Sequence, residues 1–493
     1  MDCKGRNRTH AVTGPKSQSP NVSKLIMSYD STRRRIVHDI HQARIVEFSK
    51  RYRCGFPTIV LLPGGMGSQL DRSPNAYTGD GSVSGAGFEN VWLDLGVFFG
   101  RDAELIEIQP SDADLDDHII VANGPLMFPV NAYDGAKGFF EQLGWNYIVF
   151  AYDWRRPIAA AAAFLEEFLA ALAAEVKARK NCDPLPSTTL LAHSQGGLVS
   201  KVFLQRTFTS PNVKPEKVAA TFQCLITVGS PFYGTSSHQD RYYVGQKPLD
   251  IRYGHGKIAR IAGSLPGPYI LMFADRPTLD RDGEALGLKA YPITDADTDE
   301  PADPYDEANL SRYPAWVSPD FLSDALDIRG TITASLPETV IDRVFHIRSG
   351  QNKATGARLK WKAVDGASFD PETGVSPVLP LAGSGDGTVP FWAARLAQTA
   401  SSHIYSLKIA SDHGTLVEHE ETLQVLQHLI ENDRLPKPAT IKAKNRTLGF
   451  EKASRAAADQ LVVDIVANNV APDDPRANDP RIWRRLIEDV ALC

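Results

Sequence analysis

A serine with the surroundings of a nucleophile lies in the segment 192–197 (AHSQGG), directly after the apolar run 188–192 (TTLLA). The run predicts a buried strand, and the glycines after it predict the start of a helix. Such an abrupt strand-to-helix turn strains its corner residue and needs small residues on either side. Ala192 and Gly196 meet this need, although glycine is more usual at the first position. The segment therefore predicts a nucleophile elbow with Ser194 at its corner.

A carboxylate and an imidazole follow in the order Ser, acid, His that such a fold uses. Asp386 lies in the glycine-rich segment 383–390 (GSGDGTVP) and is the predicted acid, the alternative being an Asp-Gly turn of no consequence. His413 follows a predicted strand and is the predicted base. Its rival is His419, which we expect on the surface of the next helix. In a triad the imidazole accepts the serine proton, and the carboxylate orients the imidazole and stabilises its cation.

Two backbone N–H groups are predicted to hold the negative oxygen of a tetrahedral intermediate. One belongs to Gln195, the residue after the nucleophile. The other is assigned to Met66, in the glycine-rich segment 63–68 (PGGMGS) that follows the apolar run 58–62. A glycine-rich loop after a strand also suggests phosphate binding, but the lysine of a P-loop is missing. We therefore discard nucleotide binding and expect no cofactor and no metal in the site.

The elements that position these residues alternate along the chain. Apolar runs predict strands at 58–62, 147–150, 188–192, 222–228, 344–348 and 404–409. Between them lie helical patterns, one with Phe164, Phe168 and Leu172 on a single face and one from residue 415 to about residue 432. Strands that alternate with helices predict an α/β fold with a doubly wound, mostly parallel sheet.

The alternation fails between Gly234 and Ile341, where Pro, Asp and Tyr are frequent, and this predicts an inserted cap. The predicted organisation is a basic and partly disordered extension (1–56), a first core part (57–234, lid about 67–92), the cap (235–340), a second core part (341–434) and a helical tail (435–493). The acidic run 295–306 lacks the ligand spacing of a calcium loop, so we expect a solvated segment. Residues 153–155 (DWR) are expected to form a local ion pair that braces a loop.

The composition, 43% hydrophobic and 23% charged over 493 residues, is that of a globular chain and excludes collagen-like, coiled-coil and wholly disordered classes. No segment resembles a spanning helix or the apolar region of a signal peptide. Five scattered cysteines without CxxC pairs argue against a disulfide framework or a zinc site. We therefore expect a cytoplasmic protein, with peripheral contact to a membrane surface as an option.

Charge is unevenly distributed along the chain. The formal net charge is −6, yet residues 1–55 carry 12 Lys or Arg against 4 Asp or Glu. A basic arm of this kind can touch anionic lipid or nucleic acid. Since chain termini are often disordered, we favour a solvated extension and expect no nucleic acid partner.

Six ordered segments resemble the lecithin:cholesterol acyltransferase family of α/β-hydrolases, which includes phospholipid:diacylglycerol acyltransferases and related phospholipases. They are 62–68 (LPGGMGS), 91–94 (VWLD), 150–155 (FAYDWR), the elbow at 192–197, 227–234 (TVGSPFYG) and 385–389 (GDGTV). The resemblance covers about residues 57–430. It implies acyl-ester chemistry on lipids through an acyl-enzyme, with Ser194, Asp386 and His413 at the catalytic positions and a mobile lid between Gly67 and Trp92. Family members often carry a disulfide in that lid, and this chain has no cysteine there.

The predicted function is that of a serine-dependent lipid acyl hydrolase or O-acyltransferase, similar to lipases and phospholipases, acting on a lipid or ester substrate. The alternatives are a non-lipid esterase, thioesterase or amidase, and a catalytically silent hydrolase-fold binding protein. A cap of some 100 residues and a glycine-rich flap at 78–88 favour a large apolar substrate, because a small soluble ester needs neither.

Overall fold

The structure is a computed structural model of the chain. It describes residues 31–73, 88–92, 106–108, 120–126, 132–245, 255–273, 292–371, 374–408, 412–443, 460–461, 479 and 482. The flap predicted at 78–88 lies outside these residues except for Phe88, as does most of the predicted tail.

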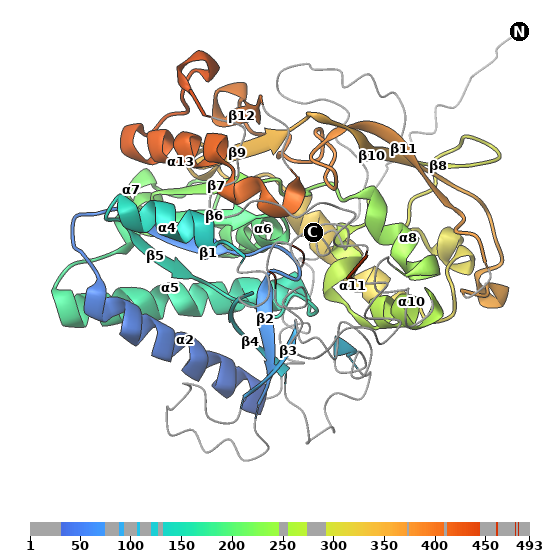
Figure 1. The fold of residues 1–493 in the computed structure, drawn as a ribbon, viewed down its shortest axis with the longest axis horizontal. Helices are drawn as coiled ribbons and strands as arrows, with labels where there is room; N and C mark the ends of the chain where they lie inside the picture. Colours follow the sequence, from blue (N-terminus) through green and yellow to red (C-terminus); the bar gives the residue numbers. More distant parts are fainter. Residues whose placement is uncertain are drawn as a thin grey trace, which may run out of the picture.

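A parallel sheet of six described strands forms the centre of the molecule (Figure 1). The strands lie in the order β12-β9-β7-β6-β1-β5, and each neighbouring pair is parallel. Their bounds are β1 (Thr58–Leu62), β5 (Asn146–Val149), β6 (Thr188–His193), β7 (Cys224–Val228), β9 (Val344–Ser349) and β12 (Ile404–Leu407). Helices cover both faces, so the predicted α/β fold with a mostly parallel sheet is confirmed.

The strand order places a crevice beside β1. The chain adds β5 on one side of β1 and then crosses back to add β6 on the other side. At such a switch point the loops after the neighbouring strands diverge, and ligands bind outside the carboxyl ends of the strands. The loops that meet there follow β1 and β6, and they carry Met66 and Ser194.

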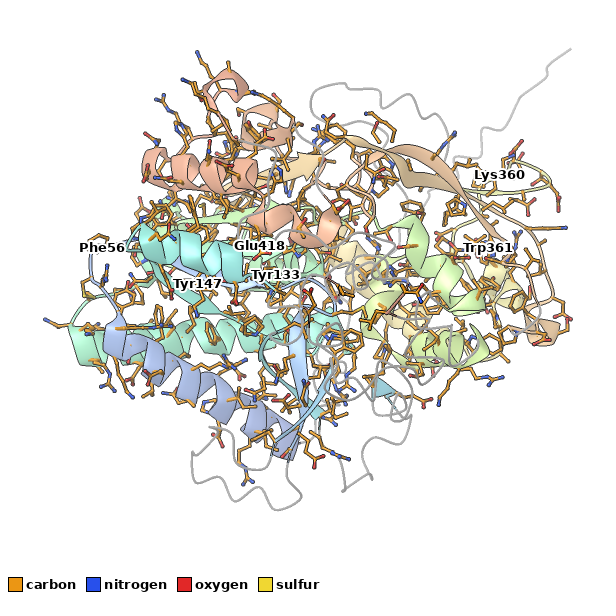
Figure 2. The ribbon with its side chains drawn as sticks, viewed as in Figure 1. Phe56, Tyr133, Tyr147, Lys360, Trp361 and Glu418 are labelled. Atoms are coloured by element: carbon orange, nitrogen blue, oxygen red, sulfur yellow. A yellow bond between two sulfur atoms is a disulfide. The ribbon has the colours of Figure 1, made fainter. Side chains whose placement is uncertain are left out.

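The side chains of alternate residues in β1 belong to two separate hydrophobic cores, one on each face of the sheet. Val60 and Leu62 face the helices α2, α5 and α6, whereas Ile59 and Leu61 face α4 and α13. Figure 2 shows Tyr133, Tyr147 and Glu418 beside α4. The helices of the two layers are α2 (Ser31–Arg51), α4 (Asp134–Gln142), α5 (Ile158–Lys180), α6 (Gln195–Thr207), α7 (Pro215–Ala219) and α13 (Glu420–Asn432). Strands covered on both faces are apolar throughout, which explains the continuous runs in the sequence.

The prediction of a solvated N-terminal extension is wrong for residues 31–51. This segment is the helix α2, whose side chains Ile36, Ile40, Ile45 and Phe48 are buried against α5 and the sheet. Because basic residues lie between these apolar residues in the sequence, the apolar face of the helix was not recognised from the sequence alone. The first 30 residues lie outside the described part of the chain.

The cysteine prediction also needs correction, because Cys54 and Cys182 form a disulfide with their Cα atoms 6.2 Å apart. The two residues follow the carboxyl ends of α2 and α5, which lie side by side; the Lys180 ammonium donates to the Lys50 carbonyl there at 2.9 Å. Cysteines 128 residues apart are brought together by helix packing, which spacing along the chain does not reveal. Since disulfides persist in oxidising compartments, the cysteines no longer favour a reducing cytoplasm. Among the described helices, none has the length and apolar character to span a membrane.

Two small sheets flank the central one. The first has the order β3-β2-β4, with β2 (Ser68–Arg72), β3 (Glu89–Trp92) and β4 (Ile120–Pro125). The second has the order β11-β10-β8, with β8 (Ile293–Asp295), β10 (Asn352–Trp361) and β11 (Val378–Gly385). The antiparallel pair β10–β11 lies between β9 and Asp386. The sequence analysis did not predict these two strands, because proline and glycine in β11 weaken a strand pattern.

Short helices between β7 and β9 form most of the described part of the inserted segment (Figure 1). They are α8 (Ser236–Val244), α10 (His255–Ser264), η3 (Gly267–Leu271), η4 (Glu307–Arg312), α11 (Pro319–Thr333) and α12 (Glu338–Ile341). The buried guanidinium of Arg329 donates to the Phe232 carbonyl after β7 at 2.7 Å and to the Met272 carbonyl after η3 at 3.0 Å. These bonds tie the inserted segment to the sheet. Asp295, the first residue of the acidic run 295–306, pairs with Arg312 at 2.9 Å. Its carboxylate is therefore not solvated, contrary to the prediction for this run.

The ion pair expected in 153–155 is present. The Arg155 guanidinium donates from Nε to Asp153 Oδ1 at 2.9 Å and from Nη2 to Oδ2 at 2.7 Å, and both side chains are buried. Arg155 also donates to the Ile106 carbonyl at 3.3 Å. The pair therefore braces the loop after β5 against the segment around Ile106.

Candidate active site

Ser194 lies at the corner between β6 and α6, with φ 50° and ψ −123°. A positive φ is strained for a residue other than glycine, and such strain is typical of a nucleophile elbow. A Cβ atom at Gly196 would lie 2.6 Å from the Leu62 carbonyl oxygen, so only glycine lets α6 approach β1 this closely. The Ser194 N–H donates to the Val228 carbonyl at 3.0 Å, which fixes the corner against β7.

The structure brings Ser194, Asp386 and His413 together, although 27 residues separate the last two and 219 separate His413 from Ser194. His413 Nδ1 lies 2.8 Å from Asp386 Oδ2, and His413 Nε2 lies 2.9 Å from Ser194 Oγ. An ionised carboxylate only accepts, so Nδ1–H donates to Asp386 and leaves Nε2 to accept from the serine hydroxyl. All three side chains are buried. This geometry can move a proton from serine to imidazole.

The carboxylate of Asp386 is held on its second oxygen. Oδ1 accepts the N–H groups of Thr388 at 3.1 Å and Val389 at 2.7 Å. Both donors belong to the turn that follows β11, so the glycine-rich segment serves to wrap its backbone around the carboxylate. Fixed in this way, Asp386 presents Oδ2 to the imidazole in one orientation.

His419 lies apart from this group, and its predicted position is wrong. It is the N-cap of α13 with 2% of its surface exposed, and its Nδ1 accepts the Glu421 N–H at 3.3 Å. The helix begins at Glu420 and not at 415, because His413–Glu418 form the 3-10 helix η7. Apolar spacing does not distinguish a 3-10 turn from the first turn of an α-helix, and this caused the error.

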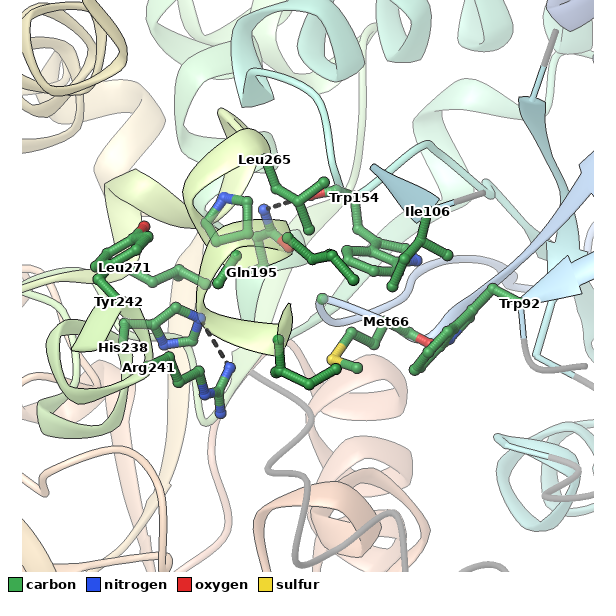
Figure 3. A pocket seen from close by; sticks show the side chains of 15 residues that line it. Met66, Trp92, Ile106, Trp154, Gln195, His238, Arg241, Tyr242, Leu265 and Leu271 are labelled. Atoms are coloured by element: carbon green, nitrogen blue, oxygen red, sulfur yellow. Dashed lines mark hydrogen bonds between the residues drawn. The ribbon is translucent and has the colours of Figure 1, made fainter. Parts of the chain in front are cut away.

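The two residues predicted to supply the oxyanion donors line the same pocket (Figure 3). Gln195 is the first residue of α6, and Met66 has φ 64° in the loop after β1. Within the described part of the chain, no hydrogen bond uses the backbone N–H of either residue. The indole of Trp92 donates to the Met66 carbonyl at 2.9 Å and so fixes the loop on its other side. Two unpaired N–H groups beside a serine are suited to binding an anionic oxygen.

The pocket beside these donors is mostly apolar. Figure 3 shows Trp92, Ile106 and Trp154 at one end and His238 with Arg241 at the other. Arg241 donates from Nη1 to His238 Nε2 at 3.1 Å, and burial keeps the pKa of His238 well below its ordinary value. The remaining lining residues are Gly65, Met66, Gln195, Tyr242, Ile258, Ile261, Ala262, Leu265, Pro268 and Leu271.

Sequence reasoning missed three buried residues near the group: His193 bonds the His413 carbonyl, Tyr133 bonds His193, and Glu418 accepts the Gly135 N–H. His193 carried a usable signal, because a histidine at the end of an otherwise apolar central strand must find polar partners inside the protein. Tyr133 and Glu418 had no signal of this kind, since their partners are distant in sequence.

Gly229, directly after β7, provides a test of how tightly the group is packed. Its φ is 60°, and a Cβ atom there would lie 2.9 Å from Asp386 Oδ2 and 3.2 Å from His413 Cε1. We expect Gly229→Ala to displace the imidazole and lower kcat about 100-fold, the cost of an error of about 1 Å in such a site. Steady-state kinetics measure the effect.

The matched control is Gly330→Ala, because a Cβ atom at Gly330 in α11 meets nothing within 4 Å. This variant should keep the kcat of the parent protein. Equal kcat values for the two variants would show that the space around Gly229 does not matter for the reaction.

Comparisons with known proteins find similarity to solved structures. No protein-family model matches the chain, and no curated protein matches it. Among solved structures, the chain is similar to one in "The crystal structure of Tle4-Tli4 complex", with 12% sequence identity and a TM-score of 0.41. The match covers 90% of this chain and 100% of that chain. A similarity of this size does not assign a family or a function.

Proposed function

We propose that the protein is a serine hydrolase that cleaves lipid acyl esters or transfers their acyl group to an alcohol. The observation that carries the proposal is the hydrogen-bonded series Asp386, His413 and Ser194 beside two unpaired N–H groups at the carboxyl edge of the sheet. Ser194 is the nucleophile, His413 the base and Asp386 the group that orients the base. No cofactor takes part in the proposed reaction.

The proposed reaction has two halves. Ser194 Oγ attacks the ester carbonyl carbon while its proton passes to His413 Nε2, and the N–H groups of Met66 and Gln195 hold the negative oxygen. The tetrahedral intermediate collapses, His413 gives its proton to the departing alcohol, and the acyl group stays on Ser194. Water or a second alcohol then attacks the acyl-enzyme, with His413 accepting its proton, and Ser194 Oγ leaves with that proton.

The apolar pocket supports an acyl chain as the part of the substrate that binds there. Aliphatic and indole side chains line most of it, as is usual for sites that bind apolar ligands. It opens beside Gln195, next to the nucleophile, so an acyl carbonyl at Ser194 would place its chain among these side chains. Such a substrate is presented at a lipid surface, and peripheral contact with that surface is part of the proposal.

A chain-length series tests this proposal. Nitrophenyl esters from acetate to palmitate are assayed below and above their aggregation thresholds, with Ser194→Ala as the blank. We expect higher kcat/KM for long chains than for acetate, and a rise in rate on aggregation, because the apolar pocket gains free energy from each buried methylene.

A pocket-filling variant sharpens the test. Ala262 of α10 lines the pocket, so Ala262→Phe should lower kcat/KM for long chains and leave acetate hydrolysis unchanged. A preference for acetate with no rise on aggregation would leave a general esterase, and products from thioesters or amides alone would indicate those reactions. A protein that cleaves none of these substrates and does not react with a fluorophosphonate would favour the alternative of a catalytically silent binding protein. Mass spectrometry of a lipid extract, with and without added alcohols, separates hydrolysis from transfer.

A further inference from the structure

Two buried residues that the proposed reaction does not use connect the loop after β1 with the candidate base. The Tyr133 hydroxyl lies 2.9 Å from the Gly64 N–H nitrogen and 2.9 Å from His193 Nδ1. His193 Nε2 lies 3.0 Å from the carbonyl oxygen of His413. All four groups are buried, and the two imidazole rings of His193 and His413 pack with their centroids 5.0 Å apart.

Each hydrogen bond in this series has one direction. A carbonyl oxygen only accepts, so His193 Nε2–H donates to His413. A neutral imidazole has one N–H group, and His193 Nδ1 therefore accepts from the Tyr133 O–H. The Tyr133 oxygen in turn accepts the Gly64 N–H. Burial lowers the pKa of His193 to about 3, so the imidazole is neutral at neutral pH, and its hydrogen-bond partners select this tautomer.

The segment that carries His413 is held at its other end by the same part of the chain. Glu418, the last residue of η7, accepts the Gly135 N–H through Oε1 at 2.7 Å. Gly135 lies in the first turn of α4, whose N-cap is Tyr133 (Figure 2). A carboxylate is favoured at a helix N-terminus. Both ends of η7 are thus tied to the start of α4, His413 through two side chains and Glu418 directly.

We propose that Tyr133 and His193 are positioning residues, which hold His413 between Ser194 and Asp386 and keep the loop after β1 in register with it. This inference rests on the proposed function of the site. His413 gains and loses a positive charge during the reaction, and a backbone anchor keeps its Nε2 directed at Ser194 in both states. His193 suits this place because it stays neutral, whereas a second cation beside the imidazolium would oppose proton uptake.

Two substitutions test the Nε2–H donor and the Nδ1 acceptor of His193 separately. His193→Gln keeps an N–H near the position of Nε2, and His193→Asn keeps an acceptor near the position of Nδ1. We expect kcat to fall about 100-fold in His193→Asn and about 10-fold in His193→Gln, with KM within about 2-fold of the parent value. Tyr133→Phe, which removes one oxygen, should lower kcat about 10-fold. Rates of fluorophosphonate labelling should follow the same order.

The control separates positioning from stability. His41 is another buried histidine, and its Nε2 lies 3.0 Å from the Ala151 carbonyl, away from the site. His41→Gln should lose stability in a thermal melt and keep its kcat when assayed well below the melting temperature. If Tyr133→Phe and the His193 variants behave like His41→Gln, the positioning role is refuted. Should His193→Asn fail to fold, Tyr133→Phe decides alone.

Failure of this inference and failure of the proposed function give different results. A parent protein that hydrolyses esters, with variants that keep its kcat, refutes the positioning role only. A parent protein that neither hydrolyses an ester nor reacts with the fluorophosphonate refutes the proposed function, and the inference falls with it.

Discussion

Replacing Ser194 with alanine should lower kcat by about 10⁴-fold or more and abolish labelling by a fluorophosphonate. The change removes one oxygen from a buried side chain and leaves the Cβ atom in place, so the elbow should keep its conformation. The melting temperature should stay close to that of the parent protein. Labelling of the alanine variant at the parent rate would place the nucleophile elsewhere.

His413→Ala should be about as damaging as Ser194→Ala, because members of a triad act as a unit. His419→Ala is the matched comparison: it removes the N-cap of α13 and should cost about 1 kcal/mol of stability without changing kcat. An inactive His419→Ala beside an active His413→Ala would move the base to residue 419.

The second large effect concerns acid stability, because four buried histidines are neutral in the folded protein. Burial lowers the pKa of His41 to about 4 and that of His193 and His346 to about 3, and it keeps the pKa of His238 well below its ordinary value. In the unfolded chain these imidazoles take up protons near pH 6.5. Below this pH the unfolded state binds more protons, so the free energy of unfolding falls as the pH falls.

Each of these histidines contributes about 1.4 kcal/mol per pH unit, so the four together lower the free energy of unfolding by about 5 kcal/mol per unit between about pH 6 and 4.5. Desolvation raises the pKa of the carboxyl groups of Asp71 and Asp240, and these groups oppose the loss of stability over the pH range in which they take up protons. Urea denaturation at a series of pH values measures the slope.

A pair of variants isolates the contribution of one imidazole. His346 is buried between the hydroxyl groups of Thr227 and Thr399, and His346→Gln removes its titration. The slope should then decrease by about a quarter. His38→Gln changes a side chain that is 58% exposed and should leave the slope as it is. A free energy of unfolding that stays constant from pH 7 to pH 5 would contradict the prediction.

The sequence predicted the features of the site that depend on local pattern. The central strands are continuous apolar runs because helices cover both faces of the sheet, and the elbow around Ser194 is recognisable because a strand, small residues and a helix follow within a few positions. Asp386 and His413 were selected by their order along the chain and by the glycines beside them. The structure places both within hydrogen-bonding reach of the predicted group, and their catalytic role remains a prediction.

The features that the sequence did not predict depend on long-range packing. Cys54 meets Cys182 only because α2 and α5 end at the same place, and Tyr133 meets His193 across 60 residues. His419 is buried because α13 packs against the core. The acidic residues beside it in the sequence indicated a surface position instead. In each case a contact between distant residues determines the environment, and no local pattern of residue types records that contact.

The inserted segment next to the pocket is joined to the core through its backbone. The Thr235 N–H donates to the Leu271 carbonyl at 2.8 Å, the Gly267 N–H donates to the Arg155 carbonyl at 2.7 Å, and Arg329 binds carbonyls on both sides. Residues 267–272 are therefore a fixed wall, and substrate must enter without moving them. We therefore expect activity to fall sharply above one length of the substrate's acyl chain. Changing that length limit should require substitution of side chains in residues 267–272.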